Sequence, residues 1–157
     1  MEELVLEIVV PLVLLANGLA AGVLLGTQMG GWPLLDSLPP DRYVHAHAFF
    51  STRFDPFMPA CLLLTTVGDL ALALLVDGPV ARVLYLVAAA LCLGTIAISV
   101  TKNVPVNRWV RTLDPDHLPD DFAQRDPRRQ WGSWNRVRTA LSTLALIVNC
   151  ALVGLTL

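Results

Sequence analysis

The polar side chains that could take part in chemistry gather in three short stretches of an otherwise apolar chain. The first stretch holds His45 and His47, followed by Asp55. A histidine suits general-base catalysis, and histidine with carboxylate is a ligand set for iron, zinc or copper. Both rings of His-x-His point to one side on an extended chain, whereas about 200° separates them on a helix. Metal binding by His45, His47 and Asp55 is therefore one hypothesis, and inert hydrogen-bonded histidines near the membrane surface are the alternative.

The second and third stretches add amide, indole and guanidinium groups. Asn103 and Asn107 are four residues apart and share a helical face if the helix extends that far, although a proline between them favours a broken or terminal turn. Trp134, Asn135 and Arg138 also fit one helical face. Arginine offers a fixed charge that can hold an oxyanion or a phenolate. The alternative is anchoring at the membrane edge, where Trp and Arg are common.

The elements that must position these groups are predicted from hydropathy. Hydrophobic residues make up 55% of the 157 residues and charged residues 15%, against about 25% charged residues in soluble domains. This composition excludes a disordered chain, and the net charge of -2 argues against nucleic-acid binding. Four stretches reach the roughly 20 apolar residues that a membrane span needs, at about 4–25, 57–76, 80–100 and 137–157. We expect an all-α, membrane-embedded four-helix bundle, with residues 1–157 forming a single domain.

The distribution of charge predicts the orientation of the bundle. Of the 11 Lys and Arg residues, all except Arg82 lie in or beside two long loops, at about 27–56 and 101–136. Basic loops stay cytoplasmic, so we expect an integral protein of the cytoplasmic membrane with both termini outside and both long loops cytoplasmic. All three polar stretches would then meet at the cytoplasmic mouth of the bundle. The three cysteines are expected to be free thiols in that reducing context.

Other polar and small residues lie inside the predicted spans. Glu7 and Asp69 are intramembrane carboxylates, which are costly and therefore functional candidates. They could line an ion pathway, but for Asp69 we favour a structural hydrogen bond to Asn17 or Asn149 across the bundle. A stripe of glycines four residues apart follows the first span at Gly18, Gly22 and Gly26. Such a stripe is typical of close helix packing within the fold, and a homodimer through it stays open.

The second and third stretches resemble the paired motifs of a known family. The run Asn103-Val104-Pro105-Val106-Asn107, followed by Trp131-x-x-Trp134-Asn135-x-x-Arg138-Thr139, resembles the anthrone oxygenase-like family of small four-helix membrane proteins. The resemblance covers essentially the whole chain. It implies an enzyme, since characterised relatives oxidise anthrones to anthraquinones with molecular oxygen. By this resemblance the substrate is an apolar, aromatic or polyketide-like molecule of natural-product metabolism, and the motif supplies the site residues Asn103, Asn107, Trp134, Asn135 and Arg138.

The histidines lie outside these motifs and leave a metal-dependent variant open, with copper or iron as the candidates. The sequence holds no nucleotide, flavin or haem signature. In the expected monooxygenase-type chemistry, Arg138 holds the oxyanion of a phenolic or enolic substrate and His45 or His47 removes a proton. The carbanion then reacts with oxygen, either directly or at the metal. Two alternatives are a non-catalytic accessory membrane subunit that docks a partner through the loop 101–136, and the small transporter with Glu7 and Asp69.

Overall fold

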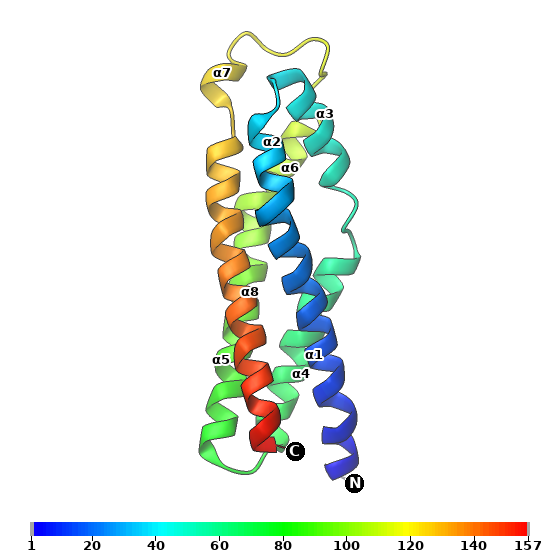
Figure 1. Ribbon diagram of the computed structural model, residues 1–157, viewed down its shortest axis with the longest axis vertical. Helices are drawn as coiled ribbons and strands as arrows, with labels where there is room; N and C mark the ends of the chain where they lie inside the picture. The colour runs from blue at the N-terminus through cyan, green and yellow to red at the C-terminus, as the bar shows by residue number, and fades with distance from the viewer. Residues whose placement is uncertain (1, 157) are drawn as a thin grey trace.

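The computed structural model is an all-helical bundle whose long helices run side by side (Figure 1). It describes residues 2–156, with the side chains of 6–154. The helical segments long and apolar enough to cross a membrane are Leu6–Ser37, Phe57–Leu75, Pro79–Val110 and Phe122–Gly154. The predicted all-α fold with four apolar spans is therefore confirmed, and the described part of the chain contains no strand.

The first and third segments are longer than the sequence predicts. The first runs through α1 (Glu2–Gly26), the π-helical turn η1 (Thr27–Gly31) and α2 (Trp32–Ser37). The third runs through α5 (Pro79–Ile98), the π-helical turn η2 (Ser99–Asn103) and α6 (Val104–Val110). We expected loops from residues 27 and 101, and this was wrong. Each π turn is followed by a helix with proline in its first turn, and proline lacks the N–H that would continue the regular hydrogen-bond pattern of the preceding helix.

The other elements complete the loop end of the bundle. They are α3 (Pro40–Phe50), α4 (Phe57–Leu75), α7 (Phe122–Arg125) and α8 (Arg128–Thr156). Helix α3 lies between the first two spans, so that His45 and His47 stand on a helix and not on an extended chain. Because α6 extends the third segment and α8 begins early, the long loop predicted over 101–136 shortens to 111–127.

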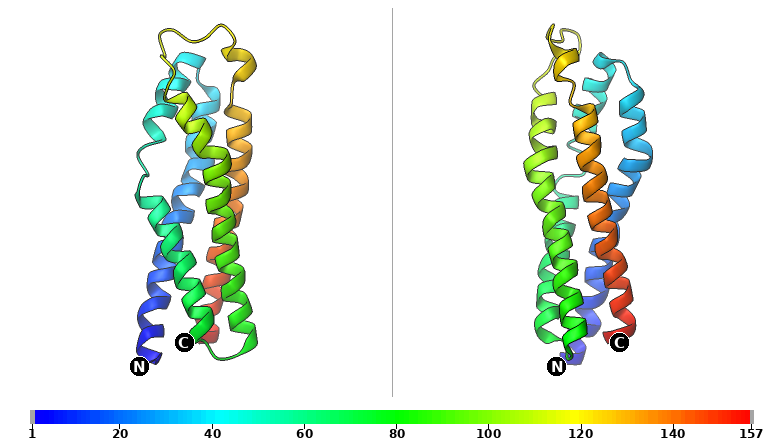
Figure 2. Two further views of the ribbon diagram at one scale, coloured as in Figure 1. Left: turned by 180° about the vertical axis from the view of Figure 1, so that it is seen from behind. Right: turned by 90° about the vertical axis from the view of Figure 1, so that its left-hand side faces the viewer.

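Both ends of the described chain lie at one end of the bundle, with α3, α6 and α7 at the other (Figure 1). At the end that holds the termini, α4 and α5 form a tight hairpin in which Gly78 adopts φ 96°, a value that glycine tolerates best. The irregular connection between α3 and α4 runs along the outer edge of the bundle (Figure 2, left). One end therefore holds both termini and a tight hairpin, and the other holds the longer connections, as predicted. That the end with the longer connections faces the cytoplasm stays a prediction.

The glycine stripe does not pack helices together within the chain. A Cβ atom added at Gly18, Gly22 or Gly26 would meet nothing within 4 Å. The predicted packing role was wrong, because these positions face open space and not a neighbouring helix. Close approach is provided instead by Gly68 of α4, where a Cβ would stand 2.3 Å from Val13 Cγ2 of α1.

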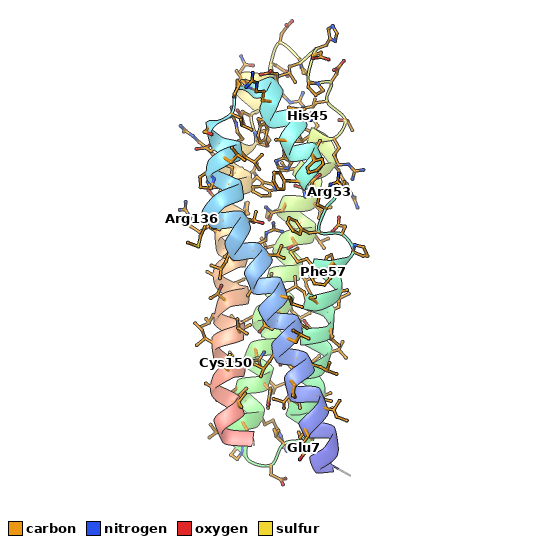
Figure 3. The ribbon with its side chains drawn as sticks, turned by 45° about the vertical axis from the view of Figure 1, so that its right-hand side comes forward. Glu7, His45, Arg53, Phe57, Arg136 and Cys150 are labelled. Atoms are coloured by element: carbon orange, nitrogen blue, oxygen red, sulfur yellow. The ribbon has the colours of Figure 1, made fainter. Side chains whose placement is uncertain are left out.

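Asp69 is tied into the bundle by a chain of amide groups. Asn149 Nδ2 donates to Asp69 Oδ2 at 3.4 Å and to Asn17 Oδ1 at 3.2 Å. Asn17 Nδ2 in turn donates to the Ser142 carbonyl at 3.3 Å. The predicted structural hydrogen bonds across the bundle are confirmed. Glu7 is exposed near the end that holds the termini (Figure 3).

Candidate active site

A cavity of about 600 Å³ occupies the loop-side half of the bundle. All four helical segments and α3 contribute to its wall, which is mostly apolar. The hydrogen-bonding or charged side chains that line it are Thr27, His47, Ser51, Asp55, Ser99, Asn107, Trp131 and Arg138. Small-molecule sites usually have volumes of roughly 300–1,000 Å³ and a few converging polar groups. The cavity therefore has the size and character of a site for an apolar organic molecule.

Two π-helical turns place polar side chains around this cavity. In η1, Gln28 Oε1 accepts a hydrogen bond of 2.8 Å from Asn135 Nδ2 of α8. In η2, Ser99 Oγ accepts one of 3.2 Å from Arg138 Nη1, and Asn103 Nδ2 donates to the Trp131 carbonyl at 3.2 Å. A π turn inserts one extra residue into a helix and occurs often at functional sites. Both turns therefore present polar side chains that form hydrogen bonds with groups of α8.

His47 has a defined tautomer because of its neighbours. Its Nε2 lies 2.9 Å from Asn107 Oδ1, and Trp131 Nε1 donates to the same oxygen at 2.8 Å. An indole N–H can only donate, so the Asn107 oxygen must face both groups and Nε2 of His47 must carry the proton. The lone pair of the neutral ring is then on Nδ1, which is buried without a hydrogen-bond partner.

Aromatic rings hold the imidazole of His47 in place. Tyr43 packs edge-on at 5.3 Å between ring centroids, and Trp131 does so at 5.1 Å. The His47 side chain is only 2% exposed. Burial lowers its pKa below 6.5, and the hydrogen bond to Asn107 opposes that shift only in part. Burial therefore favours the neutral form of His47, whose Nδ1 has no hydrogen-bond partner among the described residues.

Arg138 is a buried cation without an anionic partner. The residue is 7% exposed and lines the cavity. None of the ion pairs among the described side chains includes it. Its partners are neutral: Nε and Nη2 donate to Asn135 Oδ1 at 3.0 and 2.8 Å, and Nη1 donates to Ser99 Oγ.

The hydrogen bonds of Arg138 leave part of the guanidinium available. Of the five N–H donors that arginine carries, three are used in these bonds. One N–H on each terminal nitrogen is left for a molecule in the cavity. A buried charge that lacks a counter-ion is costly unless it acquires one. The site is thus preorganised to receive an oxyanion.

The structure brings most of the predicted site residues together. His47, Asn107 and Arg138 line the cavity, while Asn103 and Asn135 hold the groups that line it. Trp134 does not join them. It lies under Lys102, whose Nζ is 5.2 Å from the ring centroid, and it does not line the cavity. Anchoring at the membrane edge, the alternative stated for this residue, fits that position better.

The three residues considered as metal ligands are spread apart. His47 is buried, whereas His45 is exposed, because the two lie on different faces of α3 (Figure 3). Asp55 is exposed at the edge of the cavity. No group of three or more His, Cys, Asp or Glu side chains placed to hold a metal ion occurs among the described residues. Among the described residues, His45, His47 and Asp55 therefore do not come together as a metal site.

Sequence reasoning missed three residues of the site as candidates: Trp131, Ser99 and Gln28. Trp131 had a usable signal, because it lies four residues before Asn135 and seven before Arg138, on the same helical face. Ser99 and Gln28 had no such signal, because they reach the site through π turns that the sequence pattern does not predict.

Comparison with protein families adds an independent finding. A family model described as anthrone oxygenase matches residues 47–148. The matched part begins at His47 and includes Asn107, Trp131 and Arg138. Comparisons with curated proteins and with solved structures gave no match.

Proposed function

Because the chain belongs to the anthrone oxygenase family, we propose that it is a membrane-embedded oxygenase-like enzyme whose active site is the cavity at the loop end. One observation carries the proposal. A mostly apolar cavity is lined by a buried arginine that has no anionic partner among the described side chains and by a buried histidine whose Nδ1 has no hydrogen bond among them. A cation that awaits an oxyanion, beside a base that can create one, is the arrangement needed to deprotonate carbon next to a conjugated carbonyl.

The proposed substrate is an apolar aromatic ketone of the anthrone type. His47 Nδ1 takes a proton from the ring CH₂ group, and the electron pair moves through the ring system onto the carbonyl oxygen. The free N–H groups of Arg138 stabilise the oxyanion that results. Because the wall around it is mostly apolar, this electrostatic interaction is stronger than it would be in solution.

Molecular oxygen is the proposed co-substrate and oxidant. The carbanion forms a C–O bond with O₂, and the resulting substrate hydroperoxide loses water to leave a carbonyl group. The CH₂ carbon is oxidised by four electrons and O₂ is reduced by four, so that one oxygen atom enters the product and the other leaves as water. The proton held by His47 is returned in forming that water.

The membrane location suits such a substrate. A polycyclic ketone partitions into lipid, and the cavity lies within helical segments that are apolar enough to span a bilayer. We propose that the loop end faces the cytoplasm, because nearly all Lys and Arg residues lie in or beside the connections at that end. Arg138 forms no ion pair among the described side chains, which also suits a neutral substrate that becomes negatively charged only during reaction.

The proposal is tested with purified protein in lipid vesicles supplied with anthrone under ¹⁸O₂. We expect anthraquinone with one labelled oxygen at a rate above that of protein-free vesicles. His47→Gln should lose the excess rate, while His45→Gln on the exposed face of the same helix should keep it. Turnover that survives in His47→Gln, or equal rates with and without protein, would overturn the proposal.

A further inference from the structure

The cavity has a rim on α1 and η1 that is made of glycine. Gly26, Gly30 and Gly31 all line the cavity. Gly26 and Gly30 are also exposed, whereas Gly31 is half-buried. These two positions therefore belong both to the wall of the cavity and to the surface of the first apolar segment, Leu6–Ser37.

The absence of side chains at these two positions leaves the rim open. A Cβ atom at Gly26 or at Gly30 would meet no other atom within 4 Å. Neither glycine has a positive φ, so backbone conformation does not explain why glycine stands there. Close packing within the chain does not explain it either, since nothing in the chain packs against these positions.

The opposite rim is formed by the end of α3 and the beginning of α4. Phe50, Phe54 and Met58 line the cavity there, and the two phenylalanines are 38% and 36% exposed. In Figure 3 this part of the chain, at Arg53 and Phe57, lies across from α1 and α2. An opening bordered by glycine on one side and by aromatic rings on the other is apolar, and it suits a ligand that arrives from lipid.

We propose that Gly26 and Gly30 form a lateral portal through which a flat, lipid-dissolved substrate enters the cavity and its product leaves. The inference rests on the proposed function for the identity of the molecule that passes. The route itself is inferred from the geometry of the cavity alone. His47 and Arg138, the two residues that would recognise such a molecule, line the cavity behind this portal.

The same helix supplies matched controls. Gly18 and Gly22 continue the stripe at the same spacing and also have open space around them. Neither lines the cavity. If the stripe served as an interface with a second copy of the chain, leucine at any of its positions would disturb it. If Gly26 and Gly30 form a portal, only those two positions would affect access.

The route is tested without reference to turnover. A cysteine is placed deep in the cavity by Leu62→Cys, in a Cys150→Ala background that removes the exposed native thiol. Labelling by pyrenylmaleimide dissolved in the vesicle lipid should slow about tenfold when Gly26→Leu and Gly30→Leu are both present, as a barrier of about 1.4 kcal/mol predicts. Gly18→Leu with Gly22→Leu should leave the rate unchanged. Leu24→Cys, a second buried position of the wall, repeats the test if Leu62→Cys does not fold.

The outcomes separate the portal from the proposed reaction. Unchanged labelling in the Gly26→Leu, Gly30→Leu protein overturns the portal, and so does equal slowing by the control pair. Slowed labelling in a protein whose wild type does not oxidise anthrone supports the portal and rejects the reaction. If labelling is slowed and the wild type oxidises anthrone, anthraquinone binding to the Gly26→Leu, Gly30→Leu protein is measured by stopped flow. Association and dissociation should both be slowed by a similar factor, with the equilibrium affinity unchanged. A loss of affinity alone would identify the glycines as part of the binding wall, which contradicts a portal.

Discussion

Replacing Arg138 by methionine should slow anthrone oxidation strongly without unfolding the protein. The side chain is buried, and no anionic partner among the described side chains neutralises it. Removing one preorganised donor from an oxyanion costs about 2.7–4 kcal/mol, or about 10²–10³ in rate. Because Arg138 offers two free N–H groups and a full charge, we expect the loss to reach at least this range.

The stability of the variant should change little. Replacing Arg138 removes a buried charge, whose desolvation penalty is several kcal/mol. Against this, Asn135 Oδ1 loses the two donors it accepts from, which costs about 1–3 kcal/mol for an unsatisfied buried acceptor. The two effects offset each other, so the midpoint of thermal unfolding in detergent should stay near that of the wild type.

The pH dependence of turnover separates an electrostatic role from a structural one. If Arg138 stabilises the substrate oxyanion by about 2.7–4 kcal/mol, the variant needs a medium about 2–3 pH units more basic to form the same amount of carbanion. Rates of anthraquinone formation measured across that range should therefore rise steeply in Arg138→Met. The rate of Arg138→Lys, which keeps the charge but not the planar geometry, should lie between the rates of the wild type and of Arg138→Met. A variant that is folded and equally active, or one whose loss is the same at every pH, would refute the reasoning.

Three further predictions concern other parts of the bundle. Burial lowers the pKa of His47 from 6.5, so the unfolded chain binds its proton first as the pH falls. The free energy of unfolding should then decrease below pH 6.5 by up to about 1.4 kcal/mol per pH unit, and His47→Gln should remove this slope. A Cβ at Gly132 would lie 2.5 Å from Trp32 Cε2, so Gly132→Ala should lower stability by about 1–3 kcal/mol in chemical unfolding. Asp69→Asn can keep the contact with Asn149 and should leave anthrone turnover unchanged; a proton-coupled flux lost in this variant would favour transport instead.

The sequence was sufficient for the spans and for one face of α8. Hydropathy alone located the four apolar segments, because a lipid-facing helix needs a long run of apolar residues whatever its neighbours are. The spacing of Asn135 and Arg138 placed both on one helical face, and the structure joins them by hydrogen bonds. Local periodicity is enough for such pairs, since it is set by the helix itself.

The details that decide the site depend on contacts between segments. Helical spacing separates His45 from His47 but does not say which one faces inward; the docking of α3 through Tyr43 and Val44, both buried, decides that. Tyr43 and His47 share a helical face because they are four residues apart, but only the structure shows that this face is buried. The π turns had no comparable signal, so the reach of Ser99 to Arg138 could not be predicted.

The two buried polar clusters of the bundle have different roles. The hydroxyl groups of Thr65, Thr66 and Thr139, which lie along α4 and α8, donate to carbonyls four residues earlier in their own helices. Among the described side chains, no hydrogen bond links the Asp69 cluster with Arg138 or His47. A proton pathway through the bundle would need such links, since each transfer requires a donor within reach of an acceptor. In the proposed reaction, the proton that His47 accepts is exchanged within the cavity, and Asp69 helps to hold the helices together through Asn149.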